Sequence, residues 1–301
     1  LHLSIRRQRQ MCIRDRQYTE FIHPEDEAAL KTLKAIPILP TIVKKFMDIG
    51  AEQLQTGLNM ASKVKLSPTQ LPRLYNILPP ICERLDIKEP DFYLEMNPVP
   101  NAYAFGDTQI AITITSALVD MMSEEELIGV VAHECGHIAC RHMLYHTLAQ
   151  LLANASGMFE ALATLAVPVH YALMYWQRKS ELSCDRAAAY IVGPKVTASM
   201  LARLAGGPKS ITSELNLEEL AEQADLYDAF CKNGLWNKAL QTYAVMDQDH
   251  PFTSVRVREM LKWTVSEEYK NLIKNNPICP KCHKAIDPSW KFCQHCGQKL
   301  I

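Results

Sequence analysis

Two histidines and a glutamate stand at metal-binding spacing near the middle of the chain. His133 and His137 lie four residues apart within the apolar run 127–139. On a helix this spacing puts both imidazoles on one face, one turn apart, as two ligands of a tetrahedral zinc require. Glu134 can take a proton from a metal-activated water. The motif predicts metal-assisted hydrolysis with Glu134 as general base, although such a motif also arises by chance.

A third zinc ligand must come from elsewhere in the chain, because a catalytic zinc has three protein ligands and an open position. Glu181 and Asp185 lie four residues apart in a charged stretch that includes Arg178 and Arg186. Taken alone, such carboxylates are more often solvated surface groups. Because the chain also contains the two-histidine motif, we predict that Glu181 binds the metal. Asp185 would accept the other ring proton of a ligand histidine and so fix its tautomer.

The cysteines indicate a second zinc near the C-terminus. Two Cys-x-x-Cys pairs are separated by ten residues and consist of Cys279, Cys282, Cys293 and Cys296. This pattern is typical of a structural zinc ribbon with four thiolate ligands, in which the metal supplies most of the folding free energy. Two disulfides or a redox pair are the alternative. The six other cysteines are scattered, which favours free thiols in a reducing compartment.

A small sheet and a set of helices must position these groups. Alternating apolar and polar residues predict strands over 92–96, 101–106 and 110–115, which we expect to form one antiparallel sheet. Ser123 and Glu126 have the spacing of a capping box and so predict where the helix of the two histidines begins. Helical periodicity predicts further helices over 25–33, 41–60, 217–231, 236–246 and 255–269.

The apolar run 161–176 raises the question of a membrane. It is shorter than the roughly 20 residues that span a bilayer, and it contains Pro168 and His170. We therefore expect a buried helical hairpin, with peripheral membrane contact through residues 144–176 as the alternative. Together with the scattered free thiols, this predicts a cytoplasmic location, with membrane association as the alternative.

The first sixteen residues are expected to be non-native, since residues 11–16 look like a translated sequencing adapter. Without their five Arg and one Asp, 27 basic residues stand against 32 acidic ones. A mildly acidic chain with few lysines around its paired cysteines is not expected to bind nucleic acid. We predict three segments: a non-native stretch 1–16, a hydrolase domain 17–275 and a zinc-ribbon domain 276–301.

Several motifs in one order make the chain resemble the M48 metallopeptidases, a family that includes the CAAX prenyl protease and proteases of the HtpX type. The resemblance runs from residue 23 to about residue 258. It rests on the two-histidine motif and its approach 127–132, and on these further stretches: Arg141-His142, Glu181-x-x-x-Asp185, His23-Pro24-Glu25-Asp26, Asn101-Ala102-Tyr103 and His250-Pro251 followed by Arg256.

The resemblance implies a zincin-like α+β fold, mostly helical, in which an edge strand binds the substrate backbone. The residues of that strand would be Asn101, Ala102, Tyr103, Ala104 and Phe105. The resemblance also implies that His250 stabilises the oxyanion and that Arg256 pairs with a carboxylate. For His250, a turn role before Pro251 is the alternative. We expect His142 and His146 to continue the zinc helix beyond His137 as core or interface histidines.

These observations together predict a zinc endopeptidase that acts on peptides or unfolded proteins and holds one catalytic and one structural zinc. The alternative is a catalytically silent adaptor that recruits partners through its ribbon. An intact Glu134 argues against the adaptor, because a scaffold does not need a general base.

Overall fold

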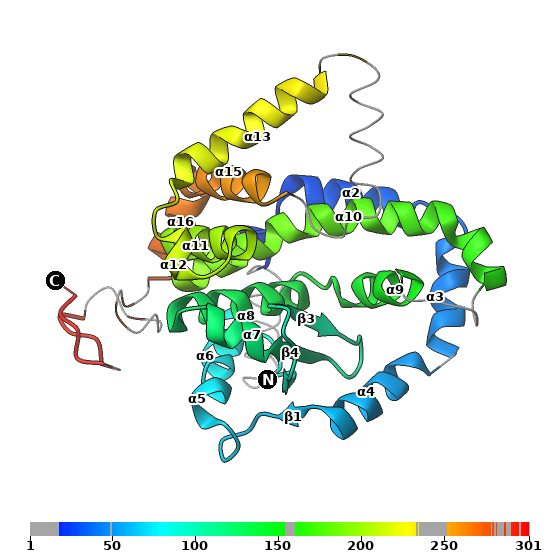
Figure 1. Ribbon diagram of the computed structural model, residues 1–301, viewed down its shortest axis with the longest axis horizontal. Helices are drawn as coiled ribbons and strands as arrows, with labels where there is room; N and C mark the ends of the chain where they lie inside the picture. The colour runs from blue at the N-terminus through cyan, green and yellow to red at the C-terminus, as the bar shows by residue number, and fades with distance from the viewer. Residues whose placement is uncertain are drawn as a thin grey trace, which may run out of the picture.

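The computed structural model describes residues 18–48, 50–153, 160–232, 234 and 252–277, and residues 279, 281, 286, 290–294 and 296–300 of the C-terminal segment. The fold is α+β and mostly helical (Figure 1). Its elements are η1 (Tyr18–Glu20), α2 (Pro24–Lys34), α3 (Leu39–Asp48), α4 (Ala51–Ser62), β1 (Val64–Lys65), α5 (Pro72–Tyr75), α6 (Leu78–Leu85), β2 (Asp91–Glu95), β3 (Ala102–Phe105), β4 (Ala111–Thr115), α7 (Ser116–Met121), α8 (Glu124–Ala139), α9 (Met143–Ala153), α10 (Glu160–Val192), α11 (Pro194–Gly206), α12 (Lys209–Thr212), α13 (Leu217–Lys232), α15 (Thr253–Thr264) and α16 (Glu267–Asn275).

The sheet has the strand order β1-β2-β4-β3 and is mixed. The three predicted strands are present as β2, β3 and β4, and β3 forms an antiparallel hairpin with β4 around Gly106, whose φ is +103°. The prediction of an antiparallel sheet was wrong, because β2 pairs with β4 in parallel, with Asp91 opposite Ala111. The hairpin folds back so that its second strand, β4, lies next to β2. This arrangement leaves β3 at the edge of the sheet.

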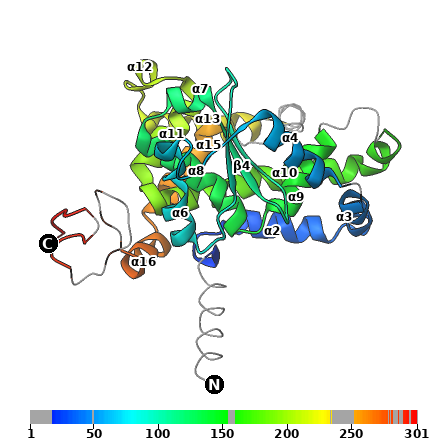
Figure 2. The ribbon, with the colours of Figure 1, turned by 90° about the horizontal axis from the view of Figure 1, so that it is seen from below.

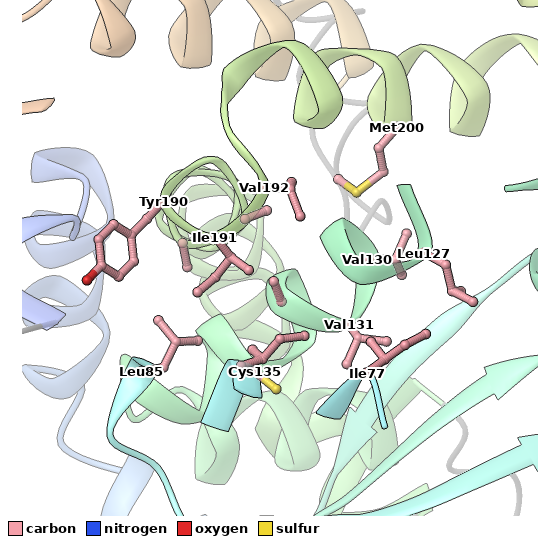
Figure 3. Packing of buried hydrophobic residues seen from close by; sticks show 14 of the residues in the cluster. Ile77, Leu85, Leu127, Val130, Val131, Cys135, Tyr190, Ile191, Val192 and Met200 are labelled. Carbon is pink, nitrogen blue, oxygen red and sulfur yellow. The ribbon is translucent and has the colours of Figure 1, made fainter. Parts of the chain in front are cut away.

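Helix α8 lies at the centre of the fold, and its apolar side packs against α6, α10 and α11. Figure 3 shows Val131 and Cys135 of α8 in one buried cluster with Leu85 of α6, Ile191 of α10 and Met200 of α11. Burial of these side chains removes most of the apolar surface of α8 from water, which stabilises the fold. Helix α10 runs past more than one side of α8. The histidines of α8 lie on the side that faces Glu181 of α10 and strand β3.

A second, smaller apolar cluster joins the N-terminal helices to the long helix α10. It contains Leu33 of α2, Ile42 of α3, Leu148 of α9, and Leu173 and Trp176 of α10. In both views α2 runs along α10 (Figures 1 and 2), and the two helices are in contact. The N-terminal helices are therefore part of the packed body of the protein.

The predicted helices are mostly present, with two breaks. The stretch 41–60 forms two helices, α3 and α4, because Gly50 adopts a left-handed φ of +70° between them. The stretch 255–269 also divides, since Ser266 caps the new helix α16 by accepting the amide of Tyr269. The predicted helix 236–246 lies outside the described residues.

The apolar run 161–176 lies within α10, which contacts α9. From Val169 onward the run contributes buried side chains to the second cluster, as a buried hairpin requires. Among the helices that the structure describes, none combines the length and apolarity needed to cross a bilayer.

The start of α8 has the predicted capping box. Ser123 Oγ accepts the amide of Glu126, and Glu126 Oε2 accepts the amide of Ser123 at 2.9 Å. The Glu126 carboxylate also accepts hydrogen bonds from Ser199 and Arg203 of α11, and it is 3% exposed. Burial would raise the pKa of Glu126, but the hydrogen bonds from Arg203, Ser199 and Ser123 outweigh burial and lower it. This carboxylate therefore ties the zinc-motif helix to α11 as an anion.

We predict that Glu126→Gln lowers the free energy of unfolding by about 3 kcal/mol at pH 7, because it leaves buried Arg203 without its counter-charge. Since the folded-state pKa of Glu126 is lowered, its contribution is complete above the ordinary carboxyl pKa and is lost as pH falls through the folded value. The difference between wild type and variant should therefore shrink in acid, as measured by urea unfolding at pH 7 and pH 4. The matched control is Glu125→Gln, an exposed position of the same turn. An equal loss in the control would contradict the prediction.

Candidate metal centre

Three predicted ligand side chains converge between α8 and α10. His133 Nε2 lies 3.2 Å from Glu181 Oε2, and His137 Nε2 lies 3.2 Å from Glu181 Oε1. The two imidazole rings are 5.2 Å apart at their centroids and nearly perpendicular. His133 is 6%, His137 3% and Glu181 0% exposed. One buried carboxylate thus faces both ring nitrogens from a helix about fifty residues further along the chain.

A close approach of the two helices makes this convergence possible. Gly136 lies on the side of α8 that meets α10, where a Cβ atom would stand 3.0 Å from Ala187 Cβ and 3.1 Å from Cys184 Cα. Such distances are tighter than ordinary van der Waals contact, so a larger residue would push the helices apart. The small residues on both helices therefore determine how near Glu181 comes to the histidines.

Asp185 and Arg256 hold the first histidine from behind. Asp185 Oδ1 lies 3.1 Å from His133 Nδ1, and Arg256 donates to both Asp185 oxygens at 2.6 and 2.8 Å. Arg256 Nη1 also lies 3.4 Å from Glu181 Oε2. Arg256 therefore pairs with a carboxylate, as the family resemblance implied. Asp185 contacts His133 at Nδ1, the ring nitrogen opposite the one that faces Glu181.

The charges in this cluster shift one another's pKa values. Burial would raise the pKa of Asp185, but Arg256 and His133 outweigh burial and lower it. Burial would lower the pKa of His133, but Glu181 and Asp185 outweigh burial and raise it to about 10. For His137, burial dominates and the pKa is lowered. The two carboxylates therefore act mainly on the first histidine.

Glu134 opens onto two cavities that lie on either side of the cluster. One has a volume of about 460 Å³ and is lined by His137, His146 and Gln177 together with β3. The other is about 220 Å³ and has apolar walls formed by Leu118, Val130, Met200 and Leu204. Glu134 and Glu181 line both. Glu134 is therefore accessible from both cavities.

The edge strand β3 borders both cavities. Because Asn101 O accepts the amide of Thr115 in the hairpin register, alternate residues of β3 pair with β4, and the backbone groups of Ala102 and Ala104 point away from it. Gln150 of α9 donates to Ala104 O at 3.4 Å. The hairpin turn is held by Glu52 of α4, whose Oε1 accepts the amides of residues 107, 108 and 109 at 2.7 Å. No motif in the sequence indicated this role of Glu52.

His142 and His146 are buried, as predicted, but they do not continue α8. The helix ends in a Schellman turn, in which Arg141 has a left-handed φ of +60° and His142 donates its amide to His137 O. The chain therefore returns over the motif, and the ring of His146 lies 4.2 Å from that of His137. The expectation that the zinc helix continues through these two histidines was wrong, because the chain turns at Arg141, which has the left-handed conformation that glycine usually adopts at such a turn.

Two further donor sets surround His137. Among the described residues, the sets around His137 whose ligand atoms all lie within 4.8 Å of one another are His133 with His137 and Cys184, and His137 with His146 and Glu181. The predicted set of His133, His137 and Glu181 is not one of them. Burial raises the pKa of the Cys184 thiol well above its usual value, so Cys184 is a poor ligand. His146 Nε2 faces Ser180 Oγ at 3.3 Å. Two imidazole nitrogens and the carboxylate that faces both are the donor set that suits zinc.

Three ribbon cysteines lie together at the C-terminus. The Sγ atoms of Cys279, Cys293 and Cys296 are within 4.8 Å of one another, with Cys279 and Cys296 3.6 Å apart. Gly297 has a φ of +74° and donates to Cys293 O, as the tight turn after a Cys-x-x-Cys pair requires. Thiolates in this arrangement fit zinc. Cys282 and His250, two other predicted site residues, lie outside the described residues.

The chain is similar to proteins of known family. The family model for peptidase family M48 matches residues 68–264, and that for a zinc-ribbon domain matches residues 278–300. The chain is 34% identical over 270 residues to "Plastoglobule-localized metallopeptidase 48, chloroplastic" of Arabidopsis thaliana, covering 88% of this chain and 78% of that protein. It is 27% identical over 216 residues to a "Protease HtpX homolog" of Campylobacter concisus, covering 62% and 73%.

A crystal structure of Ste24p from S. mikatae is also similar, with a TM-score of 0.47 and 14% identity over 77% of this chain and 60% of that one. The match to the family model spans more than half of the chain, and the plant relative is matched over most of its length. The chain therefore belongs to peptidase family M48 and is a metalloprotease.

Proposed function

We propose that the chain is a zinc-dependent endopeptidase in which His133, His137 and Glu181 hold the catalytic metal and Glu134 is the general base. The observation that carries the proposal is the placement of both Nε2 atoms at 3.2 Å from one buried carboxylate. Glu134 lines both cavities beside this cluster. The adaptor alternative has no comparable support, since the family match is to peptidases.

Each of these residues has its own role in the proposed hydrolysis. When bound, zinc activates water and polarises the peptide carbonyl. Glu134 accepts the proton of the attacking water and delivers it to the leaving amine. Asp185 and Arg256 keep His133 oriented, with its Nε2 toward the metal site. A role for His250 in oxyanion stabilisation stays a prediction.

The substrate backbone is proposed to pair with β3. The outward-pointing groups of Ala102 and Ala104 offer the hydrogen bonds of a sheet edge, and the strand borders both cavities. An extended peptide on this edge would place one side chain in each cavity, on either side of Glu134. Unfolded proteins and peptides, which can adopt an extended conformation, are therefore the proposed substrate class.

Removal of the metal tests this function. Treatment of the full chain with a zinc chelator should abolish cleavage of an unfolded protein such as reduced casein, and added zinc should restore it, because the histidine and carboxylate ligands supply no hydrolytic activity by themselves. Internal cuts in the products, identified by mass spectrometry, distinguish an endopeptidase from an exopeptidase. Cleavage that persists in the metal-free chain would contradict the proposal.

We further propose that the chain binds two zinc ions, the second in a ribbon of Cys279, Cys282, Cys293 and Cys296. The double variant Cys279→Ser, Cys282→Ser should reduce the zinc content from two ions per chain to one, because serine replaces two thiolates. Peptidase activity should remain, since the ribbon has no part in the proposed chemistry. Elemental analysis of the purified chain measures the content, and Cys231→Ser, a buried thiol elsewhere, is the control. An unchanged zinc content in the double variant would contradict a ribbon metal.

The division into segments 1–16, 17–275 and 276–301 and a cytoplasmic location also stay proposals. The name of the plant relative places that protein at plastoglobules. Peripheral membrane contact through residues 144–176 stays the alternative to the buried hairpin, and it rests on the apolar composition of that stretch.

A further inference from the structure

A buried carboxylate from the N-terminal helix lies close behind the metal centre. Asp26 of α2 is 0% exposed, and it precedes the stretch 68–264 that the family model matches. Its Oδ1 accepts a hydrogen bond from Trp176 Nε1 at 3.0 Å, and its Oδ2 accepts one from Ser183 Oγ. Burial would raise the pKa of Asp26, but His142 and these donors outweigh burial and lower it. Asp26 is therefore a carboxylate, which can only accept hydrogen bonds.

His142 lies between this carboxylate and a proposed ligand. Its Nε2 lies 3.0 Å from Asp26 Oδ2, a charge contact without hydrogen-bond geometry, and Nε2 has no hydrogen-bond partner in the described part of the chain. Its Nδ1 lies 3.3 Å from His137 Nδ1 and 3.8 Å from Cys184 Sγ. His142 is fully buried, so these neighbours are the groups that a proton on either ring nitrogen would meet.

The charge of Asp26 determines which ring nitrogens of His142 and His137 donate and which accept. Because the carboxylate only accepts, it favours the tautomer of His142 that carries its proton on Nε2. Nδ1 of His142 is then an acceptor and can take the proton of His137 Nδ1. The Cys184 thiol, kept protonated by burial, is a donor as well and is compatible with the same assignment. His137 is thereby left with a lone pair on Nε2, the atom that faces Glu181.

We propose that Asp26 and His142 are positioning residues of the metal centre: Asp26 fixes the tautomer of His142, and His142 fixes the tautomer and ring orientation of His137. This inference rests on the proposed zinc site. The two ligand histidines are then held in equivalent ways. Asp185 contacts His133 Nδ1 directly, whereas Asp26 reaches His137 Nδ1 through an intervening imidazole.

Zinc affinity tests the proposal, measured by competition with a chelator in the full chain. Every variant carries Cys279→Ser and Cys282→Ser, so that the ribbon does not bind the metal. His142→Phe removes the acceptor of His137 Nδ1 and should weaken zinc binding on the order of 10- to 100-fold. Asp26→Asn should weaken it by roughly tenfold, because an amide can also donate and no longer selects one tautomer of His142.

The matched control is Ser183→Ala, which removes a donor to the same Asp26 oxygen and leaves the contacts of His142 in place. It should lower thermal stability about as much as Asp26→Asn and leave zinc affinity within about twofold. Equal zinc affinities in Asp26→Asn and Ser183→Ala would overturn the proposal. The contacts of Asp26 would then contribute to stability alone. Absence of zinc binding in the parent chain would instead overturn the proposed metal site.

A second measurement needs no variant of the network. In the metal-free chain, ¹⁵N NMR of histidine-labelled protein should show the proton of His137 on Nδ1 and that of His142 on Nε2 above neutral pH. A proton on Nδ1 of His142 would overturn the proposal even if zinc binds, because His142 would then donate to His137. The ribbon and the catalytic step do not affect this result.

Discussion

Glu134→Gln should reduce kcat/KM for an unfolded protein substrate on the order of 1,000-fold and leave the zinc content unchanged. The amide has nearly the shape of the carboxylate, and it cannot accept the proton of the attacking water. Glu134 is 7% exposed and opens onto both cavities, so the substitution changes a group at the cleft and leaves the core of α8 intact. Measurement of peptidase rates and zinc content on the same preparation checks both parts of the prediction.

The control for this variant is Glu124→Gln on the first turn of the same helix, where the side chain is exposed. It removes the same charge from α8 and should leave the rate within about twofold. Normal turnover in a zinc-loaded Glu134→Gln chain would end the assignment of the general base. Loss of zinc from that variant would show that Glu134 also supports the metal.

Arg256→Met should have the largest effect on stability in the metal-free chain. Arg256 is 7% exposed and lies against two buried carboxylates, Asp185 and Glu181. Without it, both charges lose the arginine that lies against them, and breaking a buried pair in this way costs about 3 to 5 kcal/mol. Zinc affinity should fall as well, by roughly tenfold or more, because Asp185 is no longer held against His133. Urea unfolding and chelator competition measure the two effects.

Arg258→Met, two residues further along α15, provides a matched control. Arg258 also pairs with two carboxylates, Asp225 and Asp228, but these side chains are 69% and 41% exposed. Exposed ion pairs contribute about 0 to 1 kcal/mol, so this variant should unfold at nearly the wild-type urea concentration. A loss equal to that of Arg256→Met would mean that surface charge on α15, and not the pair behind the metal centre, accounts for the effect.

The metal centre could be predicted from the sequence because helical spacing is a local property. His133 and His137 share a helix face by their separation alone, and the Ser123–Glu126 capping box determines where that helix begins. The same holds for Glu181 and Asp185, whose separation puts them on one face of α10. The zinc ribbon could also be predicted from the spacing of its paired cysteines, since a metal site of this kind has few other geometric requirements.

What the sequence alone did not determine depends on how the chain turns and packs. The mixed sheet arises because β4 lies between β2 and β3, and strand order has no signature in the alternation of residues. The return of His142 over His137 depends on a left-handed arginine, for which no local propensity is expected.

The contact of Asp26 with His142 was decided by tertiary structure as well, because it joins residues more than a hundred positions apart. Long-range packing alone brings α2 against α10. Spacing along a helix therefore identified the groups that converge at the proposed metal site, whereas the docking of separate helices determined which side chains contact them.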